Sequence, residues 1–328
     1  MKLVVVIVAA LSGCAGLWAA EPPQAEISNN VVSARFYLPD PDSGYYRATR
    51  FDWSGVISSL DYKGHSYFGQ WFEKYDPKIH DAIMGPVEEF TTGTAGFGFN
   101  EAKAGGPFVR IGVGAVRKPA KPPASGFVTY DIIDPGLWTV QRGPDWISFT
   151  HQLSDSAGYA YVYKKTIRLT KGKPEMVLEH SLKNTGQRVI ETSVYDHNFF
   201  VIDEQASGPD FVVKFPFAAK ATGDLKDILE VQDKQLTYRR KLEKNETVLT
   251  PITGFSENLS DYNIAVENRK TGAGVTVTAD QPLARVVFWS APKVVSPEAY
   301  INLKIQPGEE RTWRMAYEFY MLPAGVKK

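Results

Sequence analysis

The sequence is poor in residues that form disulfides, bind polyanions or cross a membrane. Among 328 residues it has a single cysteine, Cys14, so the folded chain contains no internal disulfide. Basic and acidic residues balance at 37 each, and this neutral charge gives no support to nucleic-acid binding. No apolar run after the N-terminus is long enough for a transmembrane helix. We therefore expect a folded domain outside the bilayer that does not bind nucleic acid.

Signatures of several common enzyme classes are also missing. The chain has no G-x-S-x-G nucleophile elbow, no H-E-x-x-H pair, no cysteine cluster and no glycine-rich phosphate loop beside a helix. His197 with Asp196 and Asp203 does not have the spacing of a metal site. We therefore expect neither a metal nor a cofactor, and proton-exchanging side chains remain the candidates for chemistry.

The first 20 residues are typical of an export signal. A basic start is followed by an apolar run over residues 3–10, which is too short to span a bilayer. Residues 11–14 resemble a bacterial lipobox, in which Cys14 would carry a lipid anchor. Cleavage near Ala20 would instead release a soluble protein, and both alternatives remain open. The expected location is periplasmic or secreted, with or without the anchor.

Short strand-like segments separated by turn residues fill the rest of the chain. The 27 Gly and 21 Pro indicate many turns. Helical patterns are rare, and residues 77–83 and 224–231 are the best candidates. The Pro- and Lys-rich residues 117–126 lie between strand patterns of the same type, so we interpret them as a surface loop and not a linker. The pattern predicts an all-β antiparallel sandwich in one domain from about residue 26 to 323.

Residues 174–203 combine a hairpin pattern with the side chains of a sugar site. Two alternating strands flank the turn signal Asn-Thr-Gly-Gln at residues 184–187. On the second strand, alternation places Tyr195 and His197 on one side and Asn198 on the other. Aromatic rings stack on sugar C–H faces, and a histidine can hold or release a proton near pH 7. The alternative is a packed histidine without a chemical role.

Three segments resemble the galactose mutarotase (aldose 1-epimerase) superfamily. Residues 195–200, YDHNFF, are similar to a strand end of that family that reads N-H-x-Y-F. A strand at 285–290, then YINLKIQPGE at 300–309 and a final strand from Trp313, is similar to the family's C-terminal layout. Residues 51–68 resemble its opening hairpin. The resemblance implies a β-supersandwich that interconverts aldose anomers or epimers, with a base at the anomeric hydroxyl and an acid at the ring oxygen.

The resemblance places the general acid at His197. The family's usual glutamate has no counterpart, because the matching residues 288–291, FWSA, contain no carboxylate. On the next expected strand, residues 300–305, the polar side continues back to Glu298, which is the candidate base by position. A solvated glutamate after Pro297 is the alternative.

Further polar and aromatic residues are candidates for the pocket walls. Glu88 and Glu89 could replace the family's second histidine, because carboxylates accept hydrogen bonds from adjacent hydroxyls; an exposed turn is the alternative. Arg110, on an expected strand at 108–116, must face water, a carboxylate or a ligand, because burying it unpaired is costly. The expected substrate-binding residues are Arg50, Trp53, Glu88, Glu89, Arg110, Tyr195, Asn198 and Trp289.

Together these observations predict an exported carbohydrate-active protein with a sugar or glycan as its ligand. An enzyme like the aldose mutarotases and epimerases is the favoured interpretation, as the resemblance implies. A non-catalytic carbohydrate-binding protein would keep the aromatic pocket and lose the acid–base pair. A polysaccharide lyase could use Tyr195 as base and His197 as acid, but its acidic polymer favours a positive cleft, and the neutral net charge argues against it.

Overall fold

The computed structural model describes residues 21–91, 96–121 and 127–323. The expected export signal and Cys14 therefore lie outside the described residues. The regular secondary structure of the described chain consists of antiparallel strands and two short 3-10 helices, η1 (Ile202–Glu204) and η2 (Leu259–Asp261). Neither helix has the length or the apolar surface to cross a membrane.

The strands form four sheets. In sheet order, the largest comprises β16 (Leu229–Gln232), β17 (Gln235–Tyr238), β14 (Phe211–Lys214), β19 (Asn263–Asn268), β20 (Ala273–Ala279), β23 (Glu310–Met321), β12 (Glu175–Asn184), β11 (Tyr159–Leu169), β10 (Trp146–Ser156) and β9 (Leu137–Arg142). The second comprises β15 (Lys220–Ala221), β18 (Val248–Thr253), β21 (Arg285–Ala291), β22 (Val294–Ile305), β13 (Ile190–His197) and β5 (Val87–Thr91). The two smaller sheets are β1 (Gln24–Ser28), β2 (Val32–Tyr37), β3 (Val56–Tyr62) and β4 (His65–Ser66), and β6 (Pro107–Arg110), β7 (Gly114–Arg117) and β8 (Ile132–Asp134).

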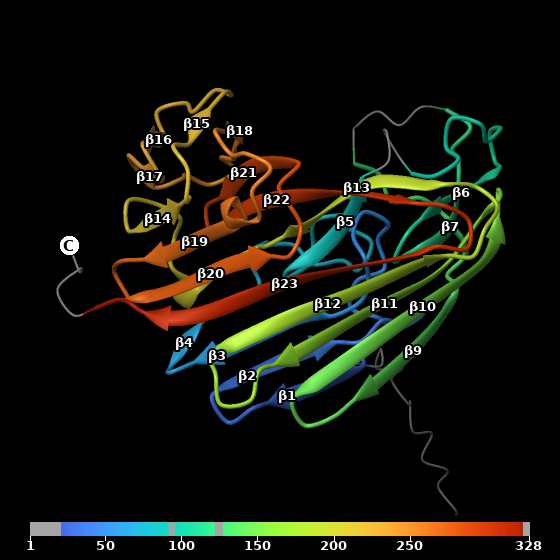
Figure 1. Cartoon of the computed structure of the whole chain (residues 1–328), viewed down its shortest axis with the longest axis horizontal. Coiled ribbons are helices and arrows are strands. Elements are labelled where there is room, and N and C mark those ends of the chain that lie inside the picture. Colours follow the sequence, from blue (N-terminus) through green and yellow to red (C-terminus); the bar gives the residue numbers. More distant parts are fainter. Residues whose placement is uncertain (1–20, 92–95, 122–126, 324–328) are drawn as a thin grey trace, which may run out of the picture.

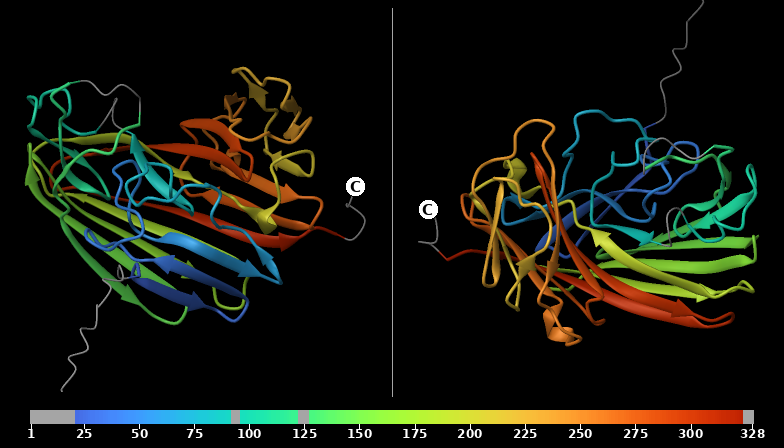
Figure 2. Two further views of the ribbon diagram at one scale, coloured as in Figure 1. Left: turned by 180° about the vertical axis from the view of Figure 1, so that it is seen from behind. Right: turned by 90° about the horizontal axis from the view of Figure 1, so that it is seen from above.

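The ten-stranded and six-stranded sheets pack face to face. Strands β13, β22 and β5 lie over the long strands β10, β11, β12 and β23 (Figure 1). Figure 2 shows from behind that the N-terminal strands, in blue, lie against the long green strands. Side chains of both sheets share one buried cluster, to which Val194 and Ile301 contribute from one sheet and Leu178 and Met315 from the other. Truncation of such a core residue to alanine costs about 2–5 kcal/mol. The prediction of an all-β antiparallel sandwich is confirmed.

Strand β22 begins six residues earlier than the sequence predicts. It starts at Val294, so Glu298 lies inside a strand and pairs with Val287 of β21. The backbone carbonyl of Pro297 points towards the end of β13, where it accepts a hydrogen bond from Asn198 Nδ2 at 2.6 Å. In an antiparallel strand the N–H and the carbonyl of one residue point to the same side. The missing N–H of Pro297 therefore faces the end of β13 and removes no hydrogen bond from the ladder with β21.

Two expected helices and one expected strand differ from the structure. Residues 77–83 form turns, and residues 224–231 form a turn that leads into β16. The segment 108–116 is two strands, β6 and β7, joined by a turn at Gly112 with a φ of +77°. A Cβ on Gly112 would lie 2.4 Å from the Asp52 carboxylate, so this turn needs glycine for space as well as for its conformation.

Candidate active site

A pocket of about 420 Å³ opens on the face of the six-stranded sheet that points away from the ten-stranded sheet. Strands β5, β13, β18, β21 and β22 supply its floor, and loop residues close its sides. The residues that line it are Arg50, Asp81, Glu89, Thr91, Phe127, Tyr195, His197, Phe199, Leu249, Arg285, Val287, Trp289, Glu298 and Tyr300.

His197 and Glu298 face each other at the base of the pocket. His197 Nε2 lies 3.2 Å from Glu298 Oε1, and His197 Nδ1 lies 2.8 Å from Ser296 Oγ. Phe199 stacks on the imidazole with a ring-centroid distance of 3.7 Å, and Trp289 meets it edge-on at 5.1 Å. Only 3% of His197 and 5% of Glu298 is exposed. The imidazole is therefore held at both nitrogens and on its face.

Burial shifts the pKa values of His197 and Glu298 in opposite directions. It lowers the pKa of His197 well below the ordinary value of 6.5, and the Arg50 charge lowers that pKa further. It raises the pKa of Glu298 to about 8; Arg50 opposes this shift, and Glu89 adds to it. Near neutral pH the histidine is neutral and the glutamate carries a proton. Two groups in contact thus include one proton acceptor and one proton donor.

Arg50 organises one wall of the pocket. Its Nε donates to Glu89 Oε2 at 2.9 Å, and its Nη1 donates to Asp81 Oδ1 at 2.5 Å. The Tyr195 hydroxyl also donates to Glu89 Oε2, at 2.5 Å. The guanidinium lies 3.9 Å from the centroid of the Phe127 ring. Because Arg50 has two carboxylate partners, the wall is ordered without an unbalanced positive charge.

Aromatic and apolar surfaces form further parts of the pocket lining and the mouth. Tyr300 stacks on Tyr195 at 4.2 Å and donates a hydrogen bond to Glu298 Oε2 at 3.2 Å. The Arg285 guanidinium lies over the Tyr300 ring at 4.9 Å. Leu249, 56% exposed, stands at the rim. Apolar ring faces beside a few fixed polar groups are the composition of a small-molecule site.

Comparison with known proteins identifies the architecture. No family model and no curated protein matches the sequence. A solved putative aldose 1-epimerase from Escherichia coli K12 matches with a TM-score of 0.54 and 11% identity, over 92% of this chain and 100% of that one. A galactose mutarotase-like protein from Lactobacillus casei matches with a TM-score of 0.55 and 13% identity, over 91% and 100%. The chain has the galactose mutarotase-like fold. The aldose epimerase homologue from C. elegans matches similarly, with a TM-score of 0.55 and 11% identity, over 92% and 99%.

This fold brings together six of the residues expected from sequence to bind substrate or act on it. They come from a loop and from strands β5, β13, β21 and β22 of the galactose mutarotase-like sandwich. They are Arg50, Glu89, Tyr195, His197, Trp289 and Glu298.

The other four expected residues do not line the pocket. Glu88 is fully buried and points into the core, opposite to Glu89 on the same strand. Asn198 is also buried, and its side chain binds the Pro297 carbonyl and the Tyr317 hydroxyl. Trp53 is buried and donates to the Ala48 carbonyl at 2.8 Å. Glu88 and Asn198 therefore face the sandwich interior, whereas Trp53 is a loop residue packed in a second buried cluster beside it.

Arg110 supports the pocket from behind. It donates to the Arg50 carbonyl at 3.0 Å, and its Nη2 lies 3.8 Å from Glu89 Oε1. Arg110 thus has Glu89 as the carboxylate partner that a buried arginine needs, and it does not line the pocket. We interpret it as a residue that positions Arg50 and Glu89.

Sequence reasoning missed several residues that line the pocket or hold its base. Tyr300 shares a face of β22 with Glu298, and Arg285 shares a face of β21 with Trp289, so alternation carried a signal for both. Ser296 lies before the strand that the sequence predicts, at 300–305, so alternation along that strand gives no signal for it. Asp81 lies in a turn region without any periodic pattern. Only the folded chain places it beside Arg50.

A buried charged cluster lies directly beneath the pocket floor. Glu88 Oε2 accepts from Lys165 Nζ at 2.6 Å, and Glu88 Oε1 lies 2.6 Å from His180 Nε2. Burial alone would raise the pKa of Glu88, but Lys165 and His180 outweigh it and lower that pKa to about 2. Among the described residues, Glu88, His180 and Asp196 are a group whose ligand atoms lie within 4.8 Å of one another. Lys165 already supplies the compensating positive charge, so we interpret the cluster as structural.

Proposed function

We propose that this protein interconverts the anomers of an aldose or aldose derivative by acid–base catalysis at His197 and Glu298. The observation that carries the proposal is the 3.2 Å contact between these two groups at the base of the pocket. Their shifted pKa values provide a proton donor and a proton acceptor together. The galactose mutarotase-like fold supports the same reaction class.

The reaction needs one proton removed and one supplied at neighbouring oxygens of the sugar. His197 Nε2 takes the proton of the anomeric hydroxyl, whose electron pair forms the carbonyl as the bond from C1 to the ring oxygen breaks. Glu298 gives its proton to the released ring oxygen. Rotation about the C1–C2 bond and the reverse transfers close the ring as the other anomer, so atoms and charge balance. The pKa directions thus favour roles opposite to those that the sequence suggested, with His197 as base and Glu298 as acid.

Ser296 can support the tautomer that this assignment requires. Its Oγ accepts a hydrogen bond from the backbone N–H of Asn198 at 3.1 Å and lies 2.8 Å from His197 Nδ1. A hydroxyl oxygen has two acceptor lone pairs, so it can also accept from a protonated Nδ1. The His197 lone pair then lies at Nε2, which points towards Glu298 and the pocket.

The remaining pocket residues would hold and orient the sugar. Glu89 and Asp81, fixed by Arg50, accept hydrogen bonds from hydroxyls, while Trp289 and Phe127 offer apolar faces. His197 and Glu298 are almost fully buried at the base of the pocket, so a bound pyranose would displace water from the acid–base pair. General acid–base assistance contributes about 10²–10⁴-fold per group.

Exchange NMR on the purified protein with a panel of free aldoses tests the proposal. We expect faster exchange between anomers with wild type, and a loss of at least about a hundredfold in His197→Ala and in Glu298→Gln. Glu179→Gln, an exposed glutamate on β12, is the matched control and should keep wild-type rates. Exchange that persists in both site variants would refute the assignment. Sugar binding without any exchange would instead indicate a carbohydrate-binding protein.

A further inference from the structure

The floor of the pocket continues beyond the acid–base pair. A second depression of about 380 Å³ lies beside the pocket, and the two share Thr91. Its base includes Ser193 and Asn302, and its far end is formed by Glu191 and Lys304. We refer to these five residues as the β13–β22 strip.

Strand geometry makes the strip an extension of the same sheet face. On β13, Ser193 lies two residues from Tyr195 and four from His197, so all three point to one side. Asn302 has the same relation to Tyr300 on β22, and it lies opposite Ser193 in the register. Four strand residues span about 13 Å, which is longer than one pyranose ring. A ligand that fills the pocket and the strip must therefore contain more than one sugar unit.

The chemistry of the strip suits a neutral carbohydrate. Ser193 Oγ donates to Asn302 Oδ1 at 2.8 Å, and this bond orients the amide so that its NH₂ group is available to a ligand. Thr91 Oγ1 donates to the Ser193 carbonyl at 3.2 Å and keeps its lone pairs as acceptors. Glu191 and Lys304 form an ion pair at 3.0 Å, which leaves the far end without net charge. The strip thus offers donors and acceptors for hydroxyl groups and no excess charge to attract uronates or phosphates.

We propose that the substrate is the reducing end of a neutral oligosaccharide. Its terminal unit occupies the pocket at His197 and Glu298, and the next units lie along the β13–β22 strip. The inference rests on the proposed function for the position of the terminal unit. It deepens that function by naming the substrate class.

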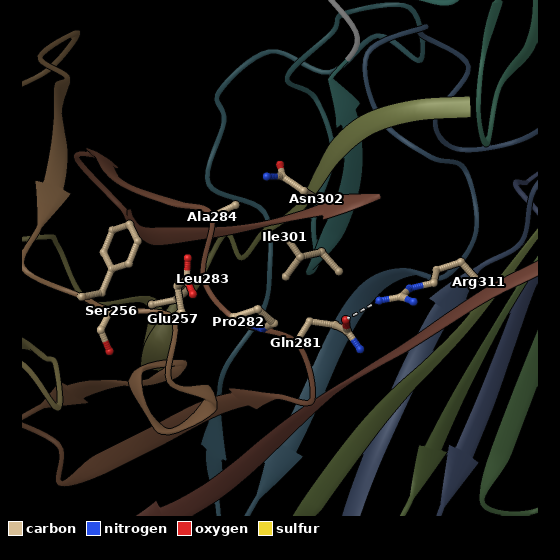
Figure 3. Close-up of a pocket in the computed structure, with 10 residues that line it drawn as sticks. Ser256, Glu257, Gln281, Pro282, Leu283, Ala284, Ile301, Asn302 and Arg311 are labelled. Atoms are coloured by element: carbon tan, nitrogen blue, oxygen red, sulfur yellow. Dashed lines mark hydrogen bonds between the residues drawn. The ribbon is translucent and has the colours of Figure 1, made fainter. Parts of the chain in front are cut away.

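A further cavity leaves room for a longer chain. It measures about 620 Å³ and meets the strip at Asn302. Strand β21 begins at Arg285 opposite Tyr300, so the rest of β22 is not paired on that side and borders this cavity. Figure 3 shows Asn302 and Ile301 on opposite sides of β22, and Arg311 bonded to Gln281 nearby. A chain of three or more units can therefore pass over the edge of β22.

Titration calorimetry on the mature protein tests the proposal without relying on turnover. The probes are neutral trisaccharides, each paired with the monosaccharide at its reducing end: cellotriose and maltotriose with glucose, β-1,4-mannotriose with mannose, and xylotriose with xylose. We expect at least one trisaccharide to bind tenfold or more tightly than its monosaccharide. The double variant Ser193→Ala with Asn302→Ala should lose that gain and keep monosaccharide affinity. Asn263→Ala, an exposed asparagine on β19, is the matched control and should change neither.

The outcomes separate this inference from the proposed function. If monosaccharides undergo anomer exchange and no trisaccharide binds more tightly than its monosaccharide, binding along the β13–β22 strip is refuted and the proposed function remains intact. Tighter trisaccharide binding that is unchanged in the double variant would also refute binding along the strip. If the double variant loses the tighter trisaccharide binding and exchange NMR detects no anomer exchange, binding along the strip is supported and the proposed function is refuted. Absence of binding by every sugar in the panel would refute binding along the strip, and exchange NMR would then decide the proposed function by itself.

Discussion

At His197 and Glu298, burial is the largest cause of pKa shifts that favour the neutral forms of both groups. Each group is nearly inaccessible to water, so its neutral form is favoured, and the neutral forms are a base and an acid. This state persists between the two shifted pKa values. The proposed chemistry therefore depends on the low polarity around the two groups.

The first prediction concerns the pH dependence of anomer exchange. The active form has Glu298 protonated, so the rate should fall as the pH rises through about 8. The acidic limb should lie well below pH 6.5, because protonation of His197 is suppressed. Exchange NMR from pH 4 to about 10 measures both limbs. A rate that increases through pH 8 would contradict the assigned protonation states.

The same glutamate should lower the stability of the fold at alkaline pH. Its folded pKa of about 8 exceeds the ordinary value of 4.5, so its contribution is fully present below 4.5 and is lost as the pH rises through 8. Glu298→Gln removes the charge and should be more stable than wild type at pH 9, with a smaller difference at pH 5. Urea denaturation at both values gives the free energies of unfolding. Equal differences at the two pH values would argue against a buried, protonated carboxyl group.

Glu88 has the opposite relation to stability. Its pKa is lowered to about 2, so it stabilises the fold above its ordinary value of 4.5, and this contribution is lost as the pH falls through 2. Glu88→Gln removes the carboxylate that binds Lys165 Nζ in the core and should cost about 3–5 kcal/mol by chemical denaturation. Adding Lys165→Met to that variant should recover much of the loss, because the unpaired charge is removed. No recovery would show that the pair acts through packing.

At the scale of the elements, strand β22 supplies three neighbouring residues of the site. Ser296, Glu298 and Tyr300 share one face of the strand: Ser296 and Glu298 contact the His197 imidazole, and Tyr300 contacts Glu298. Asn198 binds the carbonyl of Pro297 and so couples the end of β13 to this strand. The relative position of acid and base therefore depends on how two neighbouring strands align.

Ser296 gives a prediction at this scale. Ser296→Ala removes the hydrogen bond at His197 Nδ1, a contact worth about 1 kcal/mol, and leaves the pocket lining unchanged. We expect kcat to fall about tenfold, because a smaller share of His197 has its lone pair at Nε2. KM should stay close to wild type, and Ser296→Thr, which keeps a hydroxyl, should restore part of kcat. A change confined to KM would assign Ser296 to substrate binding instead.

At the scale of the whole molecule, the sandwich gathers distant parts of the chain at one face. Arg50 and Asp81 come from the N-terminal third, and Trp289 and Glu298 come from the C-terminal third. The buried cluster at Glu88 ties the two large sheets together beneath them. The site should therefore be lost with global unfolding and not before it.

Export is the prediction that concerns the whole chain. Expression of the full sequence in a bacterial host should yield a processed protein without its N-terminal signal. Mass spectrometry then distinguishes a lipidated chain that begins at Cys14 from one cut near Ala20. Cys14→Ser should abolish membrane attachment in the first case and change nothing in the second. Recovery of the chain with Met1 intact, in the cytoplasm, would refute export.

The sequence by itself determined the all-β class and, within the strands it predicted, which residues share a face. The pattern that predicted Tyr195 and His197 on one face and Asn198 on the other is local, because successive side chains of a strand point to opposite faces. The same rule, applied to β5, separates Glu88 from Glu89 but does not say which of them faces the core.

Only the tertiary structure decided which charges meet and which are buried. Arg50 with Asp81 and Glu89, and Glu88 with Lys165, join positions 31 to 77 residues apart. His197 and Glu298 are more distant still. Protonation depends on burial and on neighbouring charges, and both arise when the sheets pack. The roles of acid and base that we propose therefore depend on the fold and could not be inferred from the sequence.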